Sequence, residues 1–416
     1  MLIYLDEDII NNLDDTSVFA IQNIAECVRA GRHIIVAKRS LLKKLYMLTS
    51  ISDVDRRVFK KLYSQVTQYG SLKNRIKTYI HISSSVKNVE KKVEMDHVVY
   101  IMPVQLFSDC SNFQKTKLIC EDLFDCEFYQ SLAKYYMEQN HLSGKINFEK
   151  INGGGLNTSK NYEEKLNSNY TPCLAIIDSD KTSPEGMLGK TAQYVNAVCN
   201  KYDNNHVTYT HTLKVREKEN LIPPEIYYNL ESDAKIKEDF EFLLKMYNSE
   251  YKDSYLFGDI KSGFDKKADQ EMLKEFITVE VKKLVDEDFA IDELKEYGKQ
   301  LKQMIGDNVF CSVVDELYRE PVKEKENIIH GVRSAFGKFK ESILEGKLKD
   351  RNAQKKEIVE KHGSKTLKEE VAELETILDT ISDVTKLSIK NEFEEYWKEI
   401  ASICYEWGCK FHIHVA

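Results

Sequence analysis

Residues 117–125 have the sequence KLICEDLFD, an apolar run that is closed by Glu121, with a second carboxylate on Asp125. This pattern predicts a buried strand followed by a turn into a helix. In open α/β sheets, ligands bind beyond the carboxyl ends of the strands, where Glu121 would lie. Residues 172–180, PCLAIIDSD, repeat the pattern with Asp178 and Asp180. Two such strand ends can together hold a hard divalent cation.

The composition bounds the class of protein. A chain of 416 residues predicts two or three domains. Its net charge of -8 and pI of about 5.8 argue against a protein that coats nucleic acid through charge alone. They are compatible with a nuclease. The nine cysteines include no CxxC pair, which fits a reducing cytosol better than a disulfide scaffold or a zinc site.

No signal peptide pattern is visible, and no apolar run approaches the roughly 20 residues that span a bilayer. We therefore expect a soluble, cytoplasmic protein with no membrane partner.

Residues 1–105 alternate short apolar runs with amphipathic segments, which favours a small α/β domain with a parallel sheet. The expected strands are 2–5, 33–37, 77–82 and 97–102, and the expected helices are 18–29 and 55–68. The highly charged stretch 87–94 is expected to be a connector.

Residues 115–230 again alternate strand-like and helix-like segments, with a strand expected within 146–151 and a glycine turn at 153–155. Residues 232–416 are highly charged and mainly helical in pattern. An apolar stripe between Leu367 and Ile381 predicts a core face or a partner-helix seam. The expected order is thus a small α/β domain, a second α/β domain and a mainly helical C-terminal region.

Three acidic segments follow one another: Glu121 with Asp125, then Asp178-Ser179-Asp180, then the sequence KVREKENLIP at 214–223. This order resembles the TOPRIM domain, in the branch found in overcoming-lysogenization-defect nucleases and in the TOPRIM effectors of PARIS-type anti-phage systems. The glycines at 153–154 look like the pair that this branch places between its first two motifs, and residues 255–263 are similar to its D-x-K-x-G segment. The sequence departs from the family pattern at Asp122, where a glycine is usual.

The resemblance implies a TOPRIM-like parallel sheet flanked by helices over residues 115–230, and a nuclease that uses Mg²⁺ or Mn²⁺. Oxygen ligands suit such an ion, and Asp178 and Asp180 would point the same way from an extended segment. The implied metal ligands are Glu121, Asp125, Asp178, Asp180, Glu217 and Glu219.

The resemblance also implies that Glu121 acts as a metal ligand or a general acid/base. Lys214 or Arg216 would neutralise charge that develops on the phosphoryl group. The implied substrate is DNA or RNA, the implied role is anti-phage defence, and a separate ATPase is an expected partner. The helical C-terminal region would then dock that partner or form a homodimer.

The acids Asp6, Glu7 and Asp8 close the first expected strand, and this beginning looks like that of a PIN-type nuclease domain. The segment after the strand at 33–37 carries Lys43 and Lys44 instead of the further acid that an active PIN domain needs. We therefore expect a degenerate PIN-like domain with a structural or regulatory role. His81 is expected to be an ordinary hydrogen-bonded histidine.

Two other functions remain open from the sequence. The chain could be a non-catalytic interaction or regulatory protein in which the TOPRIM-like layer is a relic, or an RNase that acts through Asp6 of the PIN-like domain. The sequence Gly189-Lys190-Thr191 ends like a phosphate-binding loop, but Pro184 replaces its first glycine. The segment therefore predicts no P-loop.

Overall fold

The computed structural model describes residues 1–11, 13–142, 144–230, 234–260 and 392–410. By internal contacts the chain forms two compact units. Unit 1 comprises residues 1–177, 190–212 and 398–416, and unit 2 comprises residues 178–189 and 213–397. The expected stripe between Leu367 and Ile381 lies outside the described residues, as does most of the expected helical region 232–416.

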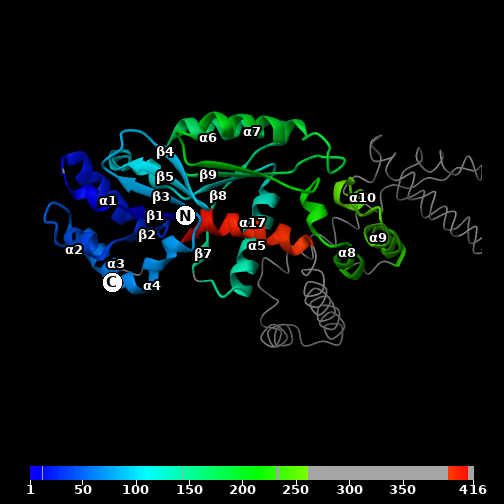
Figure 1. Cartoon of the computed structure of the whole chain (residues 1–416), viewed down its shortest axis with the longest axis horizontal. Helices are drawn as coiled ribbons and strands as arrows, with labels where there is room; N and C mark the ends of the chain where they lie inside the picture. Colours follow the sequence, from blue (N-terminus) through cyan, green and yellow to red (C-terminus); the bar gives the residue numbers. More distant parts are fainter. Residues whose placement is uncertain (12, 143, 231–233, 261–391, 411–416) are drawn as a thin grey trace, which may run out of the picture. The chain divides into compact units, whose positions relative to one another are not determined.

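Within the described part of unit 1, one sheet has five strands in the order β2-β1-β3-β5-β4 (Figure 1). These strands are β1 (Leu2–Leu5), β2 (Ile34–Ala37), β3 (Thr78–Ser83), β4 (Glu90–Glu94) and β5 (His97–Pro103). The first, second, third and fifth strands pair in parallel, as the alternation predicts. Parallel strands are covered on both faces, so β1 and β2 are apolar along their whole length.

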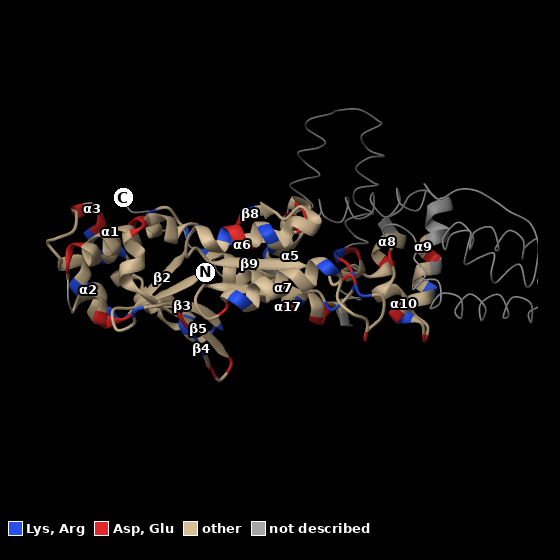
Figure 2. Cartoon of the chain, turned by 90° about the horizontal axis from the view of Figure 1, so that it is seen from above, with Lys and Arg blue, Asp and Glu red and all other residues tan. Residues whose placement is uncertain are grey.

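The expected connector at 87–94 is wrong, because residues 90–94 form the edge strand β4, which pairs antiparallel with β5. The sequence EKKVE is exposed or half-buried throughout, so it carries no apolar signal. Charged side chains are typical of edge strands, where they discourage pairing with another chain. Figure 2 shows acidic residues at the tip of this β4–β5 hairpin.

The helices beside this sheet begin at polar caps. In α1 (Asp15–Arg29) the Asp14 carboxylate accepts the Ser17 N–H at 2.7 Å. The expected helix 55–68 is divided into α3 (Asp53–Ser64) and α4 (Val66–Tyr69), which meet at Gln65. The helix α2 (Arg39–Met47) packs against α3 through buried leucines.

The second sheet of unit 1 has four parallel strands in the order β10-β9-β6-β8. They are β6 (Lys117–Cys120), β8 (Glu149–Asn152), β9 (Cys173–Ile177) and β10 (Thr208–Thr212). The two central strands, β6 and β9, are buried at every position. Helices α6 (Thr158–Ser168) and α7 (Lys190–Tyr202) cover one face, and α5 (Leu123–Gln139) covers the other (Figure 1). The predicted α/β class with helix-flanked parallel sheets is confirmed.

The single strand expected within 146–151 is wrong in one respect. Two strands occupy this stretch: β7 (Lys145–Ile146) and β8. The first pairs antiparallel with β11 (Cys409–Lys410), and the second pairs in parallel with β6. The apolar residues at 146, 148 and 151 alone do not reveal that the chain changes sheets between them.

The C-terminal segment completes unit 1. From Lys398 onward, α17 (Glu392–Gly408) leads into β11. The Trp407 ring lies edge-on to Tyr100 and stacks on Tyr209, and its carbonyl accepts the Thr116 hydroxyl at 2.7 Å. Trp407 thus contacts side chains from β5 and β10, which belong to the two different sheets.

Unit 2 contains the short 3₁₀ helix η6 (Lys218–Leu221), α8 (Pro224–Leu230), α9 (Ala234–Tyr247), α10 (Lys252–Phe257) and the beginning of α17. The Trp397 indole donates to the Leu221 carbonyl at 2.6 Å and so joins α17 to η6. No helix among the described residues combines the length and apolarity needed to cross a membrane.

Candidate functional site

The two central strands of the four-stranded sheet end beside each other. Leu118 pairs with Leu174 and Ile119 with Ala175, both in parallel. Glu121 comes two residues after Ile119 along the chain, and Asp178 directly follows Ile177, the last residue of β9. The carboxyl ends of both strands therefore lie at one edge of the sheet, the edge where α/β proteins bind ligands.

The turn after β8 fixes the backbone that follows β6. The Gly153 N–H donates to the Cys120 carbonyl at 2.8 Å, and the Gly154 N–H donates to the Glu121 carbonyl at 2.9 Å. A Cβ atom on Gly153 would collide with the Cys120 carbonyl and the Thr158 side chain. The glycine expected between the first two motifs is thus required by the close approach of two backbones at Glu121.

Asp125 lies at the beginning of α5, where it caps the helix. Its carboxylate accepts the Asp122 N–H at 3.0 Å, and the Asp122 carboxylate accepts the Asp125 N–H at 2.9 Å. This reciprocal arrangement satisfies two N–H groups that a helix beginning otherwise leaves without a partner. Asp122, at the position where the TOPRIM pattern usually has a glycine, therefore has a local structural use.

Unit 2 brings the second and third acidic segments together. The Ser179 and Asp180 N–H groups donate to the Arg216 carbonyl at 2.9 and 3.0 Å, and the Ser179 hydroxyl donates to the Val215 carbonyl at 2.6 Å. Asp180 is exposed and has a left-handed backbone with φ of 52°. Asp178 is half-buried. The Asp-x-Asp segment is therefore held by main-chain contacts rather than by its carboxylates alone.

The two cations expected to act on the substrate have different environments. The Arg216 side chain is 1% exposed, and its guanidinium contacts the Asp259 carboxylate at 3.2 Å and donates to the Phe257 carbonyl at 3.2 Å. These contacts join the Arg216 side chain to residues at the end of α10 and beyond it, and removing one partner of such a buried pair is strongly destabilising. Lys214 is exposed, so it is the more accessible of the two cations.

Glu217 and Glu219 also have structural contacts. Glu217 caps η6: its carboxylate accepts the Asn220 N–H, and its own N–H donates to the Asn220 side chain at 2.9 Å. Glu219 is buried, with Lys218 Nζ at 3.9 Å from its carboxylate. Neither glutamate is an exposed acid on a solvated helix face.

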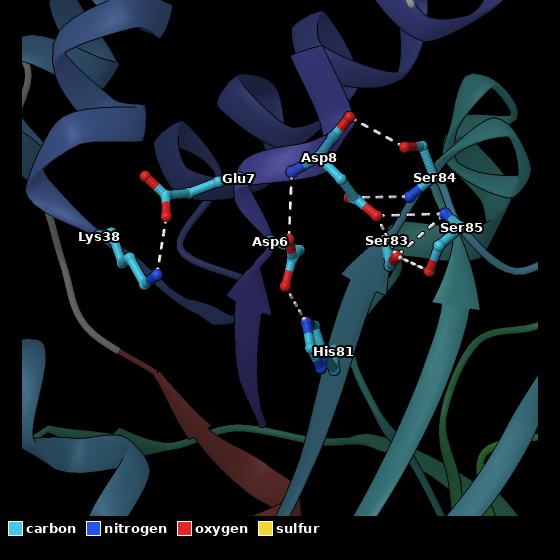
Figure 3. Close-up of polar contacts among 8 residues, drawn as sticks. All are labelled: Asp6, Glu7, Asp8, Lys38, His81, Ser83, Ser84 and Ser85. Atoms are coloured by element: carbon cyan, nitrogen blue, oxygen red, sulfur yellow. Dashed lines mark hydrogen bonds and ion pairs between the residues drawn. The ribbon is translucent and has the colours of Figure 1, made fainter. Parts of the chain in front are cut away.

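The five-stranded sheet also has acids at its carboxyl edge (Figure 3). Asp6 follows β1, and its carboxylate lies 2.9 Å from Nε2 of His81 on the neighbouring strand β3. Burial raises the pKa of Asp6, but hydrogen bonds from the Asp8 backbone and from His81 outweigh it and leave the pKa below the usual 3.8. His81 and Asp6 are 22% and 37% exposed, so the pair is partly accessible to solvent.

The two acids after Asp6 contact different elements. Asp8 accepts the Ser83 hydroxyl and the N–H groups of Ser84 and Ser85, the latter two at 3.0 and 3.2 Å (Figure 3). Glu7 contacts Lys38, which follows β2, at 2.7 Å. Sequence reasoning did not pair Asp6 with His81, although alternation along β3 places residues 79, 81 and 83 on one face.

The donor set suits a hard cation only in part. Among the described residues, no group of three or more His, Cys, Asp and Glu side chains is arranged to hold a metal ion. Mg²⁺, however, keeps several waters and commonly binds through one or two carboxylates together with substrate phosphates. Glu121 follows β6 and Asp178 follows β9, and each is a carboxylate of the kind that this mode of binding uses.

Comparison with protein-family models, with curated proteins and with solved structures finds no match to this chain.

Proposed function

We propose that the chain is a metal-dependent nuclease that hydrolyses phosphodiester bonds of DNA or RNA at the carboxyl edge of the β9–β6 pair. The observation that carries the proposal is the parallel pairing of β6 and β9, whose next residues include Glu121 and Asp178. Asp178 is covalently joined to Ile177, so its backbone begins at the end of β9. Acids at adjacent strand ends are the ligands that Mg²⁺ prefers.

In this proposal Glu121 and Asp178 hold Mg²⁺ or Mn²⁺, and Asp180 contributes from the same segment. The bound ion would polarise the scissile phosphate and lower the pKa of a water molecule. The exposed Lys214 would balance the charge of the phosphate, while Arg216 would act through the backbone it fixes beside Ser179. The TOPRIM resemblance extends the proposal to anti-phage defence with a separate ATPase as partner.

Cleavage assays test the proposal. The intact chain is incubated with labelled single- and double-stranded DNA and RNA, with Mg²⁺, with Mn²⁺ or with EDTA. We expect cleavage that requires the metal and falls at least about 100-fold in Glu121→Gln and Asp178→Asn, as is typical when a group that stabilises developing charge is removed. Glu149→Gln is the matched control, because Glu149 is the first residue of β8 and so lies at the amino-terminal end of the strands of the same sheet.

A second candidate function rests on the Asp6–His81 contact, which places a carboxylate and an imidazole at the edge of the other sheet. If Asp6→Asn abolishes cleavage while Glu121→Gln and Asp178→Asn retain it, the PIN-like domain is the catalytic one. If no metal-dependent cleavage of any substrate is found, the chain acts as a non-catalytic interaction protein and the nuclease proposal is wrong.

A further inference from the structure

A cavity of about 510 Å³ lies in unit 1, lined by residues from the C-terminal end of α5, from β7 and from β11. It is far larger than one phosphate ion needs, and it falls within the range of small-molecule sites. The described residues that line it are Lys134, Met137, Leu142, Gly144, Lys145, Ile146, Asn147 and Lys410.

Three lysines line this cavity, and two of them face each other across a pair of strands. Lys145 of β7 and Lys410 of β11 are directly opposite in the antiparallel register. Like charges at such positions destabilise a sheet. The third lysine, Lys134, belongs to the helix α5 rather than to these strands. In the described part of the chain, none of these three lysines forms an ion pair with an acid. The described residues that line the cavity include no carboxylate.

The electrostatic environment agrees with this arrangement. Burial lowers the pKa of Lys410, and the positive charges of Lys115 and Lys145 lower it further. Lys115 lies in the loop before β6, so four lysines from four segments contribute positive charge around one cavity. In a chain with a net charge of -8, this local excess is the kind of field that attracts an anion.

The remaining lining adds an apolar surface. Met137 and Ile146 are buried, and Leu142 is half-buried. Inorganic phosphate would make no use of these side chains. Binding sites for small molecules combine such apolar contacts with a few polar groups that fix orientation.

We propose that this lysine cavity binds a small molecule that carries phosphate groups and an apolar ring system, of the size of a nucleotide. Lys134, Lys145 and Lys410 contact the phosphates, and Met137, Leu142 and Ile146 contact the ring system. The site has no P-loop, and it is independent of the proposed cleavage edge, so the two proposals can fail separately.

Calorimetric titration of the intact chain with ATP, ADP, pyrophosphate, adenosine and a single-stranded oligonucleotide tests the inference, in buffer without divalent cations. We expect ATP and ADP to bind more tightly than pyrophosphate or adenosine, because only the two nucleotides supply both phosphates and a ring. Each of Lys134→Gln, Lys145→Gln and Lys410→Gln should weaken ATP binding about tenfold, the effect of losing one charge-assisted contact.

Lys43→Gln is the matched control, since Lys43 is an exposed lysine of α2 that does not line the cavity. Circular dichroism spectra and melting temperatures show whether each variant is folded. Glu121→Gln should bind ATP as the unmodified chain does, which separates this site from the cleavage edge.

Three results would overturn the inference. ATP could fail to bind at millimolar concentration, or it could bind equally well to all three lysine variants. Alternatively, only a single-stranded oligonucleotide could bind, with a loss in the same variants, which would make the lysines a contact surface for nucleic acid instead.

Discussion

In both sheets of unit 1, clustered acids follow the ends of strands, but the acids of the two sheets have different hydrogen-bond partners. After β1, Asp6 and Asp8 accept hydrogen bonds from β3 and the residues that follow it, about 75 positions away in the sequence. After β6, Asp122 and Asp125 accept each other's backbone N–H groups at the beginning of α5. The first set joins two strands, whereas the second set caps one helix.

This difference shows why an acid at a strand end is an ambiguous signal. A carboxylate there can join strands, cap a helix or bind a cation, and each use leaves the same short sequence pattern. At the first sheet the long-range partners account for Asp8. At the second sheet the cap accounts for Asp122 and Asp125, and the proposed metal role rests on Glu121 and Asp178.

The largest effect on stability is expected at the carboxyl edge of the four-stranded sheet, where the backbones at Gly153 and Cys120 lie close together. Gly153→Ala should lower the free energy of unfolding by about 3 kcal/mol, because the new methyl group would collide with the Cys120 carbonyl. Urea denaturation followed by circular dichroism measures this. Gly70→Ala is the control, since its methyl group would lie 3.7 Å from Val66, an ordinary contact. Equal stability of Gly153→Ala and the unmodified chain would show that β8 does not constrain Glu121.

An intermediate effect on stability is expected at the carboxyl edge of the five-stranded sheet. Asp8→Ala should cost about 2 kcal/mol, because the Ser84 N–H would lose its acceptor and the Ser83 hydroxyl and Ser85 N–H would each lose one of two partners. The neighbouring Glu7→Ala is the control, since it removes exposed contacts with Lys38 and Ser40 and should leave the urea midpoint nearly unchanged. A midpoint that shifts equally in both variants would contradict the strand-joining role of Asp8.

The smallest effect is expected for the partly exposed Asp6–His81 pair. A double-mutant cycle with Asp6→Asn and His81→Gln should give a coupling energy of about 0.5 kcal/mol. Because the folded pKa of Asp6 is lowered, its contribution is present above 3.8 and is lost as the pH falls through the folded pKa. The unmodified chain should therefore lose more stability than Asp6→Asn between pH 5 and pH 3. Parallel losses would show that the pKa of Asp6 is not lowered in the folded chain.

Much of the fold follows from local sequence. β1, β6 and β9 are short apolar runs closed by acids, and the structure places each of them as a central strand. β4 escaped prediction because an exposed edge strand has no apolar face to reveal it. The separation of β7 from β8 depends on β11, which lies more than 250 residues later in the chain.

The site is less accessible to sequence reasoning than the fold. The pairing of Asp178-Ser179-Asp180 with residues 215–216 is carried by main-chain groups, which every residue possesses. The burial of Arg216 depends on Asp259, whose charge alone does not indicate a partner. The order of motifs can therefore indicate candidate acids for a site. It does not show which charged residues form buried contacts within unit 2.

The return of the C-terminal segment to unit 1 has a consequence for synthesis. The residues of α17 and β11 that contact Thr116, Tyr100 and Ile146 leave the ribosome roughly 190 residues after β10, or about 10 to 40 s later at usual elongation rates. During that interval both sheets lack Trp407, so the apolar surfaces that it covers stay exposed on the nascent chain. Chaperone capture in this window would protect the protein, and truncation before Lys398 would make the exposure permanent.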